Sequence, residues 1–597
     1  MRKSIFAISL SFNLLATALA VANPLSLFVD QCLQFDAESQ VAIPNAWQSS
    51  SKTPYPPLTQ SVSLNELVAF ESPLLSLNNL NDRNNYYRRL TQQTEYQQNL
   101  LMCQVHLADE LSWLLNQIDP QLLQADKASF KLSPHQQPYY WYLTSIQQLK
   151  NAKLNVDVKS MLHGLQTSIE YNLRQQYLFE ANAECALETA SESTKKSINN
   201  ISTTAQNVAR YLLLQPKSSC RQQAWLAYQG RAKEVNQTNL LVIHKIKTKQ
   251  AKENGFADSA DFQLKNSELT VEQLSLFLNS QTENIEVAPW DLPQALKKQP
   301  KIATEIQTTA HFIDTVFELL SPFSLDFERL PTSANTTDIY RVWHKKRLLG
   351  EIFLDINTGE AAQAVNVDYF TIKQSVVGQQ LGQYALNVPF ELTKVKQYDD
   401  LIFALSDIVN QLAKGSQFYY VNQQNISPLN QQLGTYWLAT WLTSNLKLDH
   451  QQHPRAKLIN SFKKQQLVFR SKVALLFYQQ QDLSKFELYQ PILNRMLSQS
   501  FEDSFGVPYL SASDAIFSYL AIANQGISYY LLLWQQTLAQ LIYNESLSSS
   551  QAKAIFDVIV VNEHHQSLYD QLSAVFKQPM DFEHLLWRIN YVGTKQE

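Results

Sequence analysis

The sequence predicts a mainly α protein, and three observations support that prediction. The chain of 597 residues is 45% hydrophobic and 11% aromatic, which is typical of a globular protein with one large core or several. Only 12 glycines and 21 prolines occur, a composition that suits long helices better than a sandwich or barrel with many turns. Residues 99–115 place Leu100, Leu107, Leu111 and Leu114 at helical spacing, so that they share one face.

The first 22 residues have the pattern of a secretory signal peptide. Two basic residues precede an apolar run over 5–15, and small side chains allow cleavage after Ala20 or Ala22. The apolar run is too short and too interrupted for a convincing membrane span. We therefore expect an exported, periplasmic protein with no membrane span after signal cleavage.

The charge balance argues against two classes of partner. The formal net charge is −4, or −6 once Arg2 and Lys3 leave with the signal. A chain of that charge is poorly suited to nucleic acid or to an anionic membrane surface, so neither is expected as a main partner.

The cysteines favour disulfides in the N-terminal part of the chain. There are four, at Cys32, Cys103, Cys185 and Cys220, and an even number in an exported protein permits pairing. Four cysteines allow three pairings, one of which lets Cys185 and Cys220 close a hairpin. The sequence leaves the choice between these pairings open.

The order of elements along the chain divides it into regions. Residues 23–190 form an N-terminal helical region, and a polar stretch up to about 203 connects it to the remainder, 191–597. Residues 338–355 break the helical pattern, because they read as two strands joined by a basic turn. Helices are expected again after Val388 and nearly to the end of the chain.

One predicted helix, over residues 400–412, is central to the functional interpretation. Lys414 and Gly415 suit its C-terminal end. Six of its residues are expected to form an apolar face: Leu401, Ile402, Leu405, Ile408, Val409 and Leu412.

Four blocks, in this order, resemble the metallopeptidase family of thimet oligopeptidase, oligopeptidase A and peptidyl-dipeptidase. They are an arginine-led and an asparagine-led helix with a glycine-aromatic step (220–260), the strand pair (338–355), the helix at 400–412, and the segment FSYLAIANQGISYYLLLW (517–534). The resemblance covers about 200–590, with the catalytic part at about 338–590. It implies a two-lobed ellipsoid with a deep internal channel and a small β element near the former active site.

The family's zinc helix carries His-Glu-x-x-His, whose two imidazoles share one face and whose glutamate activates the metal-bound water. Here Phe403 and Asp407 stand at the histidine positions and Ala404 at the glutamate. The segment QLGTYW (432–437) resembles the family's segment with the third ligand, which places Thr435 at that position. Zinc is expected for the family, but its ligands are missing, so we expect neither a cofactor nor a metal site.

The family's peptide-binding segment is also altered at residues 517–530. Tyr519 replaces a histidine that helps to stabilise the oxyanion, and Gln525 replaces a tyrosine of the mobile loop, whereas Tyr529 and Tyr530 match. Tyr519, Gln525, Tyr529 and Tyr530 are the candidates for contact with a peptide. Core packing of a helix is the alternative explanation for the Tyr529–Tyr530 pair.

Other groups of potential ligands have simpler explanations. Asp449, His450 and His453 suit a solvated loop before a proline, and His564 with His565 suits the surface. The sequence therefore predicts a catalytically inactive homologue of zinc oligopeptidases that binds a peptide or protein partner in its channel. Two alternatives remain: a residual peptidase that uses a non-standard site, and a structural or assembly protein with an outer binding surface.

Overall fold

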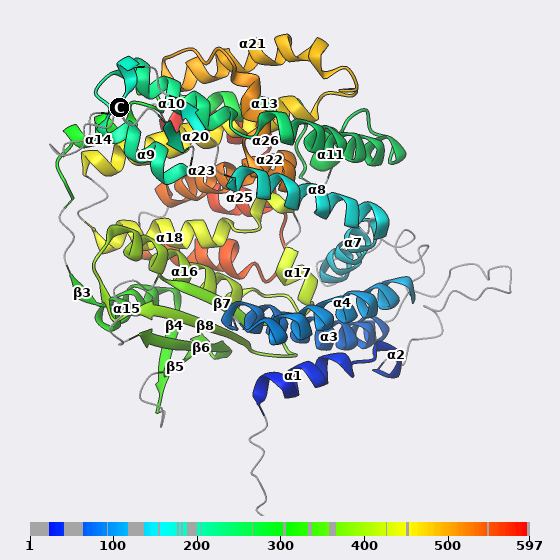
Figure 1. Cartoon of the computed structure of the whole chain (residues 1–597). Helices are drawn as coiled ribbons and strands as arrows, with labels where there is room; N and C mark the ends of the chain where they lie inside the picture. The colour runs from blue at the N-terminus through cyan, green and yellow to red at the C-terminus, as the bar shows by residue number, and fades with distance from the viewer. Residues whose placement is uncertain are drawn as a thin grey trace, which may run out of the picture. The chain divides into compact units, whose positions relative to one another are not determined.

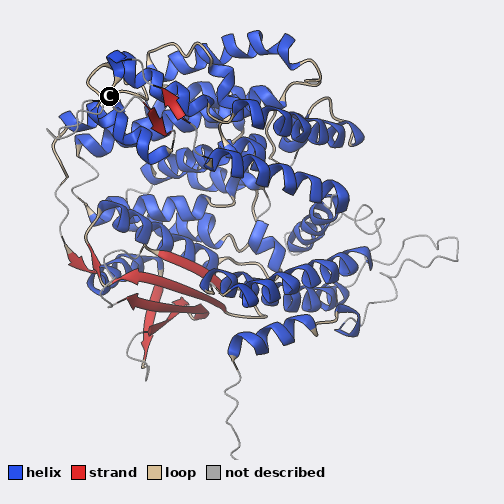
Figure 2. Ribbon diagram, viewed as in Figure 1, coloured by secondary structure: helices blue, strands red, loops and turns tan. Residues whose placement is uncertain are grey.

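The computed structural model describes residues 23–593 with internal gaps at 41–63, 92, 118–136, 153–155, 176–177, 181–182, 188–199, 203, 266, 303–305, 332–336, 358–365, 425–426, 449–452 and 546–547. The predicted signal peptide, Asp449 and His450 lie outside the described residues. The prediction of a mainly α chain with a small β element is confirmed (Figure 2). The two-lobed outline and the channel stay predictions.

By its internal contacts the chain separates into two units, residues 1–119 and 120–597. The first unit is helical, and a disulfide joins Cys32 to Cys103 within it. The predicted helical face is buried at Leu100, Leu107 and Leu114. The helices of this unit are α1 (Pro24–Leu33), α2 (Ala37–Gln40), α3 (Leu64–Leu90) and α4 (Thr94–Gln117), drawn in blue in Figure 1.

The second unit begins with helices and a small hairpin. A second disulfide joins Cys185 to Cys220, so the structure selects one of the three possible pairings. The described elements are α7 (Gln137–Ala152), α8 (Val156–Arg174), β1 (Leu178–Glu180), η2 (Ala183–Cys185), β2 (Asn200–Ser202), α9 (Ala205–Leu214), α10 (Ser218–Gly230), α11 (Lys233–Glu253), α12 (Ser259–Leu264), α13 (Val271–Ser280) and α14 (Leu292–Lys298).

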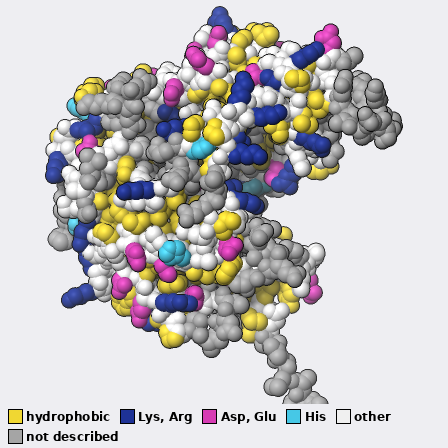
Figure 3. All heavy atoms as spheres, turned by 90° about the vertical axis from the view of Figure 1, so that its left-hand side faces the viewer, with side chains coloured by type: hydrophobic (Ala, Val, Ile, Leu, Met, Phe, Trp, Pro, Cys, Tyr) yellow, Lys and Arg dark blue, Asp and Glu magenta, His cyan; other side chains and the backbone are white. Residues whose placement is uncertain are grey.

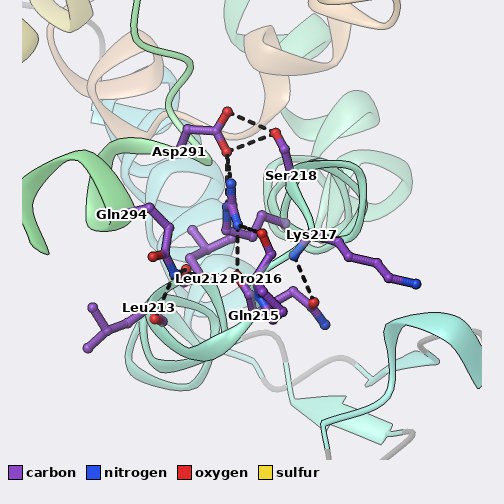
Figure 4. A network of polar contacts seen from close by, with 9 residues as sticks. Leu212, Leu213, Gln215, Pro216, Lys217, Ser218, Asp291 and Gln294 are labelled. Atoms are coloured by element: carbon purple, nitrogen blue, oxygen red, sulfur yellow. Dashed lines mark hydrogen bonds and ion pairs between the residues drawn. The ribbon is translucent and has the colours of Figure 1, made fainter. Parts of the chain in front are cut away.

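The buried arginine that begins the first resembling block has a structural explanation. The guanidinium of Arg221 donates to the backbone oxygens of Gln215 and Pro216, each at 2.7 Å, and to Asp291 Oδ1 at 2.9 Å. Asp291 also accepts from Ser218 Oγ (Figure 4). This network ties the start of α10 to the residue before α14, and it satisfies a charge that would otherwise be buried without partners.

A five-stranded sheet follows, with strand order β4-β5-β6-β8-β7. The predicted strand pair is confirmed as β5 and β6, which are antiparallel, whereas β6 and β8 are parallel. The elements of this region are β3 (Gln307–Thr308), α15 (Thr309–Leu320), η3 (Ser321–Phe323), β4 (Leu325–Leu330), β5 (Thr337–His344), β6 (Arg347–Asn357), β7 (Asp368–Lys373), β8 (Gly382–Pro389) and β9 (Glu391–Leu392).

The remaining chain is helical, as predicted. Its elements are α16 (Val395–Ala413), α17 (Tyr419–Gln424), η5 (Pro428–Asn430), α18 (Leu433–Leu446), α20 (Pro454–Tyr478), α21 (Phe486–Phe505), η6 (Ala512–Phe517), α22 (Leu520–Asn524), η7 (Gly526–Tyr530), α23 (Leu531–Asn544), α24 (Ser549–Ile555), the π-helix η8 (Phe556–Val561), α25 (Leu568–Phe576) and α26 (Phe582–Gly593). Helix α16 packs against β6, β8 and α18, and α18 packs against α23.

Two glycines allow α16 to approach the sheet closely. A Cβ on Gly350 in β6 would lie 2.2 Å from the backbone oxygen of Gly382 and 2.5 Å from Leu412 Cδ2 of α16. A Cβ on Gly382 in β8 would also lie 2.5 Å from that Leu412 atom. Larger side chains at these positions would push the helix away, so the glycines set the depth at which α16 lies on the sheet.

None of the helices in the described part of the chain is long and apolar enough to cross a membrane. On the face drawn in Figure 3, basic and acidic side chains are interspersed with hydrophobic ones. This mixture agrees with the small net charge of the sequence.

Candidate functional site

Helix α16 forms as the sequence predicts and extends five residues further toward its N-terminus. At its start, the Gln397 side chain accepts hydrogen bonds from the backbone N–H groups of Thr393 and Lys394, at 2.9 and 3.0 Å. These bonds satisfy donors that have no partner within the helix. All six predicted apolar-face residues are 0–2% exposed, so this face anchors the helix in the core.

Asp407, which the resemblance aligned with the family's second histidine, lies in a closed polar cluster. Its carboxylate accepts from Thr435 Oγ1 at 2.7 Å and from the Tyr369 hydroxyl at 3.0 Å, so both of its oxygens are engaged. Asn410 Nδ2 donates to Thr435 Oγ1 at 3.0 Å. The Asp407 cluster, as we call Tyr369, Asp407, Asn410 and Thr435, therefore joins β7, α16 and α18.

Phe403 and Ala404, which the resemblance aligned with the family's first histidine and glutamate, differ in exposure. Ala404 is 1% exposed, and the partly exposed ring of Phe403 lies 5.5 Å from that of Tyr436. Burial raises the pKa of Tyr436 to about 12, and the negative charge of Asp407 acts in the same direction. Tyr436 therefore stays neutral at ordinary pH values and adds no second negative charge beside the Asp407 cluster.

The residues at these positions do not fit the zinc ion that the resemblance implies. Phe403 has no donor atom, Thr435 is fully buried, and both oxygens of Asp407 already accept hydrogen bonds within the chain. No group of three or more His, Cys, Asp or Glu side chains in the described ranges is placed to hold a metal. His453 instead caps α20, because its Nδ1 accepts from the backbone N–H of Arg455 at 3.2 Å.

A buried lysine lies close to this cluster. Lys414, the residue after α16, is 5% exposed and donates from Nζ to the backbone oxygen of Asn422 at 2.5 Å. Burial lowers its pKa to about 8, and the charge of Asp407 opposes that shift. The end of α16 thus carries a cation at neutral pH in a place where water is scarce.

The candidate peptide-binding residues lie in a second region, around Arg470 of α20. The guanidinium carbon of Arg470 lies 4.4 Å from the centre of the Tyr519 ring, and Nη1 donates to the Tyr529 hydroxyl at 3.5 Å. Arg470 Nε is buried and has no hydrogen-bond partner among the described residues. We call Arg470, Tyr519 and Tyr529 the Arg470 group.

The other two candidates differ in their exposure. Gln525 is exposed, whereas Tyr530 is 1% exposed and packs in the core. A ligand could reach Tyr530 only after the segment had moved, whereas Gln525 is accessible as the chain stands. Direct contact with a peptide stays a prediction for all four residues.

In the Arg470 group, burial and the positive charge of Arg470 shift the pKa of Tyr519 in opposite directions. Burial raises the pKa of Tyr519, and the Arg470 guanidinium partly offsets that rise. A second cation, Lys247, lies close to the segment at residues 517–530. Its Nζ is 4.7 Å from the centre of the Tyr478 ring, and the Tyr478 hydroxyl donates to the backbone oxygen of Ile522 in that segment at 2.8 Å. Burial lowers the pKa of Lys247 to about 8.

Three residues of these two regions were not expected from the sequence: Tyr369, Asn410 and Arg470. Tyr369 and Asn410 carry no motif, and only the packing of β7 and α18 on α16 gives them a role. Arg470 had a usable signal, because it is one of two charges, with Lys472, within the otherwise mostly apolar run of α20 at residues 467–478. A charged residue inside such a run indicates a buried partner or a ligand.

No protein-family model and no curated protein matches this chain. Solved structures similar to it include a carboxypeptidase of Pyrococcus furiosus, at 10% identity and a TM-score of 0.49 over 89% of this chain and 99% of that one. The Bacillus subtilis carboxypeptidase BsuCP is similar at 9% identity and a TM-score of 0.47, over 88% and 99% of the two chains. These values are too low to identify a family, an activity or a site residue, and the thimet oligopeptidase family is not confirmed.

Proposed function

We propose that this chain is a non-catalytic protein on a zinc-oligopeptidase-like scaffold and that it binds a peptide or a peptide segment of a partner. The observation that carries the proposal is the Asp407 cluster. The side chains at two of the three ligand positions, Asp407 and Thr435, bond to each other at 2.7 Å. A carboxylate already held by two hydroxyl donors is a poor starting point for metal binding.

The Arg470 group supports the binding part of the proposal. Arg470 is half-buried, its Nε is fully enclosed, two phenols are its neighbours, and it makes no ion pair with a described residue. A buried cation of this kind is stabilised when a carboxylate or a row of carbonyl oxygens approaches it. Peptides supply both groups, and Tyr519 and Tyr529 would add apolar contact area.

Export to the periplasm belongs to the same proposal. The two disulfides are consistent with an oxidising compartment, because such bonds persist in exported proteins and are rare in the cytosol. Edman sequencing or intact-mass measurement of the mature protein, purified from a periplasmic extract, tests this part. Cleavage after Ala20 or Ala22 is expected, and an uncleaved cytosolic chain would contradict it.

The first experiment measures zinc per chain by mass spectrometry on protein purified without a metal-affinity tag. We expect far less than one equivalent. The same preparation is incubated with a library of short peptides, and both retention and cleavage are recorded. Retention without cleavage supports the proposal, whereas cleavage that a chelator abolishes supports the alternative of a residual peptidase.

A variant series separates binding by the Arg470 group from unspecific adsorption. Tyr529→Phe removes the hydroxyl that accepts from Arg470, and Tyr171→Phe makes the same change at an exposed tyrosine of α8. We expect weaker peptide retention only for the first variant. Equal retention by both would indicate that peptides bind elsewhere.

Rebuilding the zinc motif tests how far the catalytic machinery has been lost. The triple variant Phe403→His, Ala404→Glu and Asp407→His restores the motif but leaves Thr435 and Tyr519 unchanged. We expect no hydrolysis above that of the unmodified chain. Appreciable chelator-sensitive hydrolysis would show that the site retains more function than proposed.

A further inference from the structure

A hollow of about 750 Å³ lies between the β5–β6 turn and the end of the π-helix η8. The hollow falls within the size range of small-molecule sites. It is separate in sequence from the Asp407 cluster and the Arg470 group. Its lining includes His344, Lys345, Lys346, Arg347, Asp557 and His564.

The basic turn supplies three consecutive cations to one wall. Lys345 pairs with Asp557 at 3.3 Å, and Arg347 Nη2 donates to the backbone oxygen of Ala413 at 2.8 Å. Lys346 is exposed and makes no ion pair within the described part of the chain. Against these cations the lining offers two carboxylates, Asp557 and Glu563, one of which is already paired.

A buried histidine forms the floor of the hollow. The side chain of His344 is 6% exposed, and its Nε2 has no hydrogen-bond partner among the described residues; the nearest carboxylate oxygen, Asp557 Oδ1, is 3.6 Å away. Burial lowers the pKa of His344 to about 4, and Lys345, Arg347 and Lys553 lower it further against the opposing effect of Asp557. The lining of the hollow therefore carries three cations against two carboxylates, and an unsatisfied ring nitrogen lies beside them.

The backbone around the hollow is unusual as well. Residues 556–561 form a π-helix, an arrangement that often occurs at functional sites. Lys345 and Asn562, which both line the hollow, have positive φ angles of 57° and 41°. Such conformations are energetically costly for residues other than glycine, and they shape both rims of the hollow.

We propose that this hollow binds a small anion that carries carboxylate or phosphate groups. Lys346 and Arg347 contact the anion, Lys345 is shared between the anion and Asp557, and His344 donates from the floor through an N–H at Nε2. Ammonium and guanidinium groups favour both anions, and phosphate offers more oxygens to this number of donors. This site is independent of peptide binding, so either proposal can fail without the other.

Isothermal titration calorimetry on the full mature chain tests the site with two probes, inorganic phosphate and citrate. We expect saturable binding of at least one probe at millimolar concentrations or below. Binding of phosphate alone or of citrate alone supports the site and identifies the preferred group. Binding of neither probe would overturn the proposal.

Three variants locate the binding. Lys346→Ala, at an exposed residue without an ion pair, should weaken binding about tenfold, which corresponds to the loss of one charge-assisted contact. Asp557→Asn frees Lys345 and should tighten binding severalfold. Lys298→Ala, at an exposed lysine of α14, is the matched control and should change nothing. Equal weakening by Lys346→Ala and Lys298→Ala, or no tightening by Asp557→Asn, would overturn the assignment.

Discussion

The Asp407 cluster and the Arg470 group both place a charged side chain among hydroxyl groups, yet they differ in how those charges are satisfied. In the Asp407 cluster, both carboxylate oxygens accept hydrogen bonds from side chains of other elements. In the Arg470 group, one N–H is buried without a described partner, and one hydrogen bond is as long as 3.5 Å.

This difference separates a structural use of polar residues from a functional one. A polar network with every member satisfied adds rigidity and specifies one arrangement of its elements. A network with an unused donor lowers stability unless something else approaches that donor. We infer that the Asp407 cluster holds the sheet, α16 and α18 together, whereas the Arg470 group has the unused donor that the proposed peptide ligand would need.

The largest expected difference between the two regions lies in the stability cost of removing their charges. Asp407→Ala leaves the hydroxyls of Tyr369 and Thr435 without their acceptor, so we expect a loss of about 3 kcal/mol in the free energy of unfolding. Arg470→Met removes a charge that has no carboxylate partner, so we expect a change within about 1 kcal/mol. Urea denaturation followed by circular dichroism measures both.

Asp407→Asn serves as the control for the first variant, since it keeps the shape and one acceptor oxygen. We expect an intermediate loss, of roughly half the effect of the alanine variant. Equal stability of Asp407→Ala and the unmodified chain would mean that the cluster is not the support that we infer, and the comparison between the two regions would fail.

A second prediction concerns Lys414 and has a pH dependence. Its pKa is lowered from 10.5 in the unfolded chain to about 8 in the folded chain. Between pH 8 and 10.5 the unfolded chain therefore binds a proton that the folded chain does not, so this group makes stability rise with pH across that window. Below pH 8 the cost of burying the charge is fully present.

Lys414→Met removes that cost. We expect a gain of about 2 kcal/mol at pH 7, after allowance for the lost hydrogen bond to Asn422, and a loss of about 1 kcal/mol near pH 10.5, where only the lost hydrogen bond remains. Lys247→Met is the companion change beside the Arg470 group, where burial also lowers the lysine pKa to about 8. A constant gain for Lys414→Met at both pH values would show that its charge is not what limits stability.

Much of α16 could be predicted from the sequence, because a periodic apolar face and a Lys-Gly ending are local signals. The hairpin of β5 and β6 was predictable for the same reason, since adjacent strands joined by a short turn leave a local pattern. The parallel pairing of β6 with β8 was not, because the chain passes through β7 before β8 begins. Local patterns carry no information on that order.

The same distinction applies to the polar residues. Asp407 and Thr435 were singled out because the resemblance aligned them with ligand positions of the zinc family, but their mutual hydrogen bond depends on how α16 and α18 cross. Tyr369 reaches Asp407 from a strand 38 residues earlier, and no spacing rule predicts such a contact. The disulfide pairing was likewise left open by the sequence, because it follows from which segments fold together.

A third prediction tests how tightly α16 and α18 fit. A Cβ on Gly434 would lie 2.2 Å from Asn410 Oδ1, the side chain that donates to Thr435. Gly434→Ala should therefore displace Asn410 and cost roughly 1–3 kcal/mol. Gly164→Ala, in the exposed middle of α8 with no atom within 4 Å, should instead stabilise the chain by roughly 0.5–1 kcal/mol. Thermal unfolding of the two variants measures this difference, and a stable Gly434→Ala would contradict the close fit.

The smallest expected effect on stability comes from a substitution at Gln525, which tests whether the segment beside the Arg470 group contacts a ligand. Gln525 is exposed, and its side chain makes no described hydrogen bond, so Gln525→Ala should change the free energy of unfolding by less than about 0.5 kcal/mol. If the segment at residues 517–530 contacts a peptide, the same variant should still weaken peptide retention severalfold, because an amide donor and acceptor are lost. Gln98→Ala, at an exposed glutamine of α4, provides the control for a change of the same chemistry outside that segment. If only Gln525→Ala weakens peptide retention, and does so without a loss of stability, Gln525 faces the ligand. A structural residue such as Asp407 cannot give this pattern, because its replacement lowers stability.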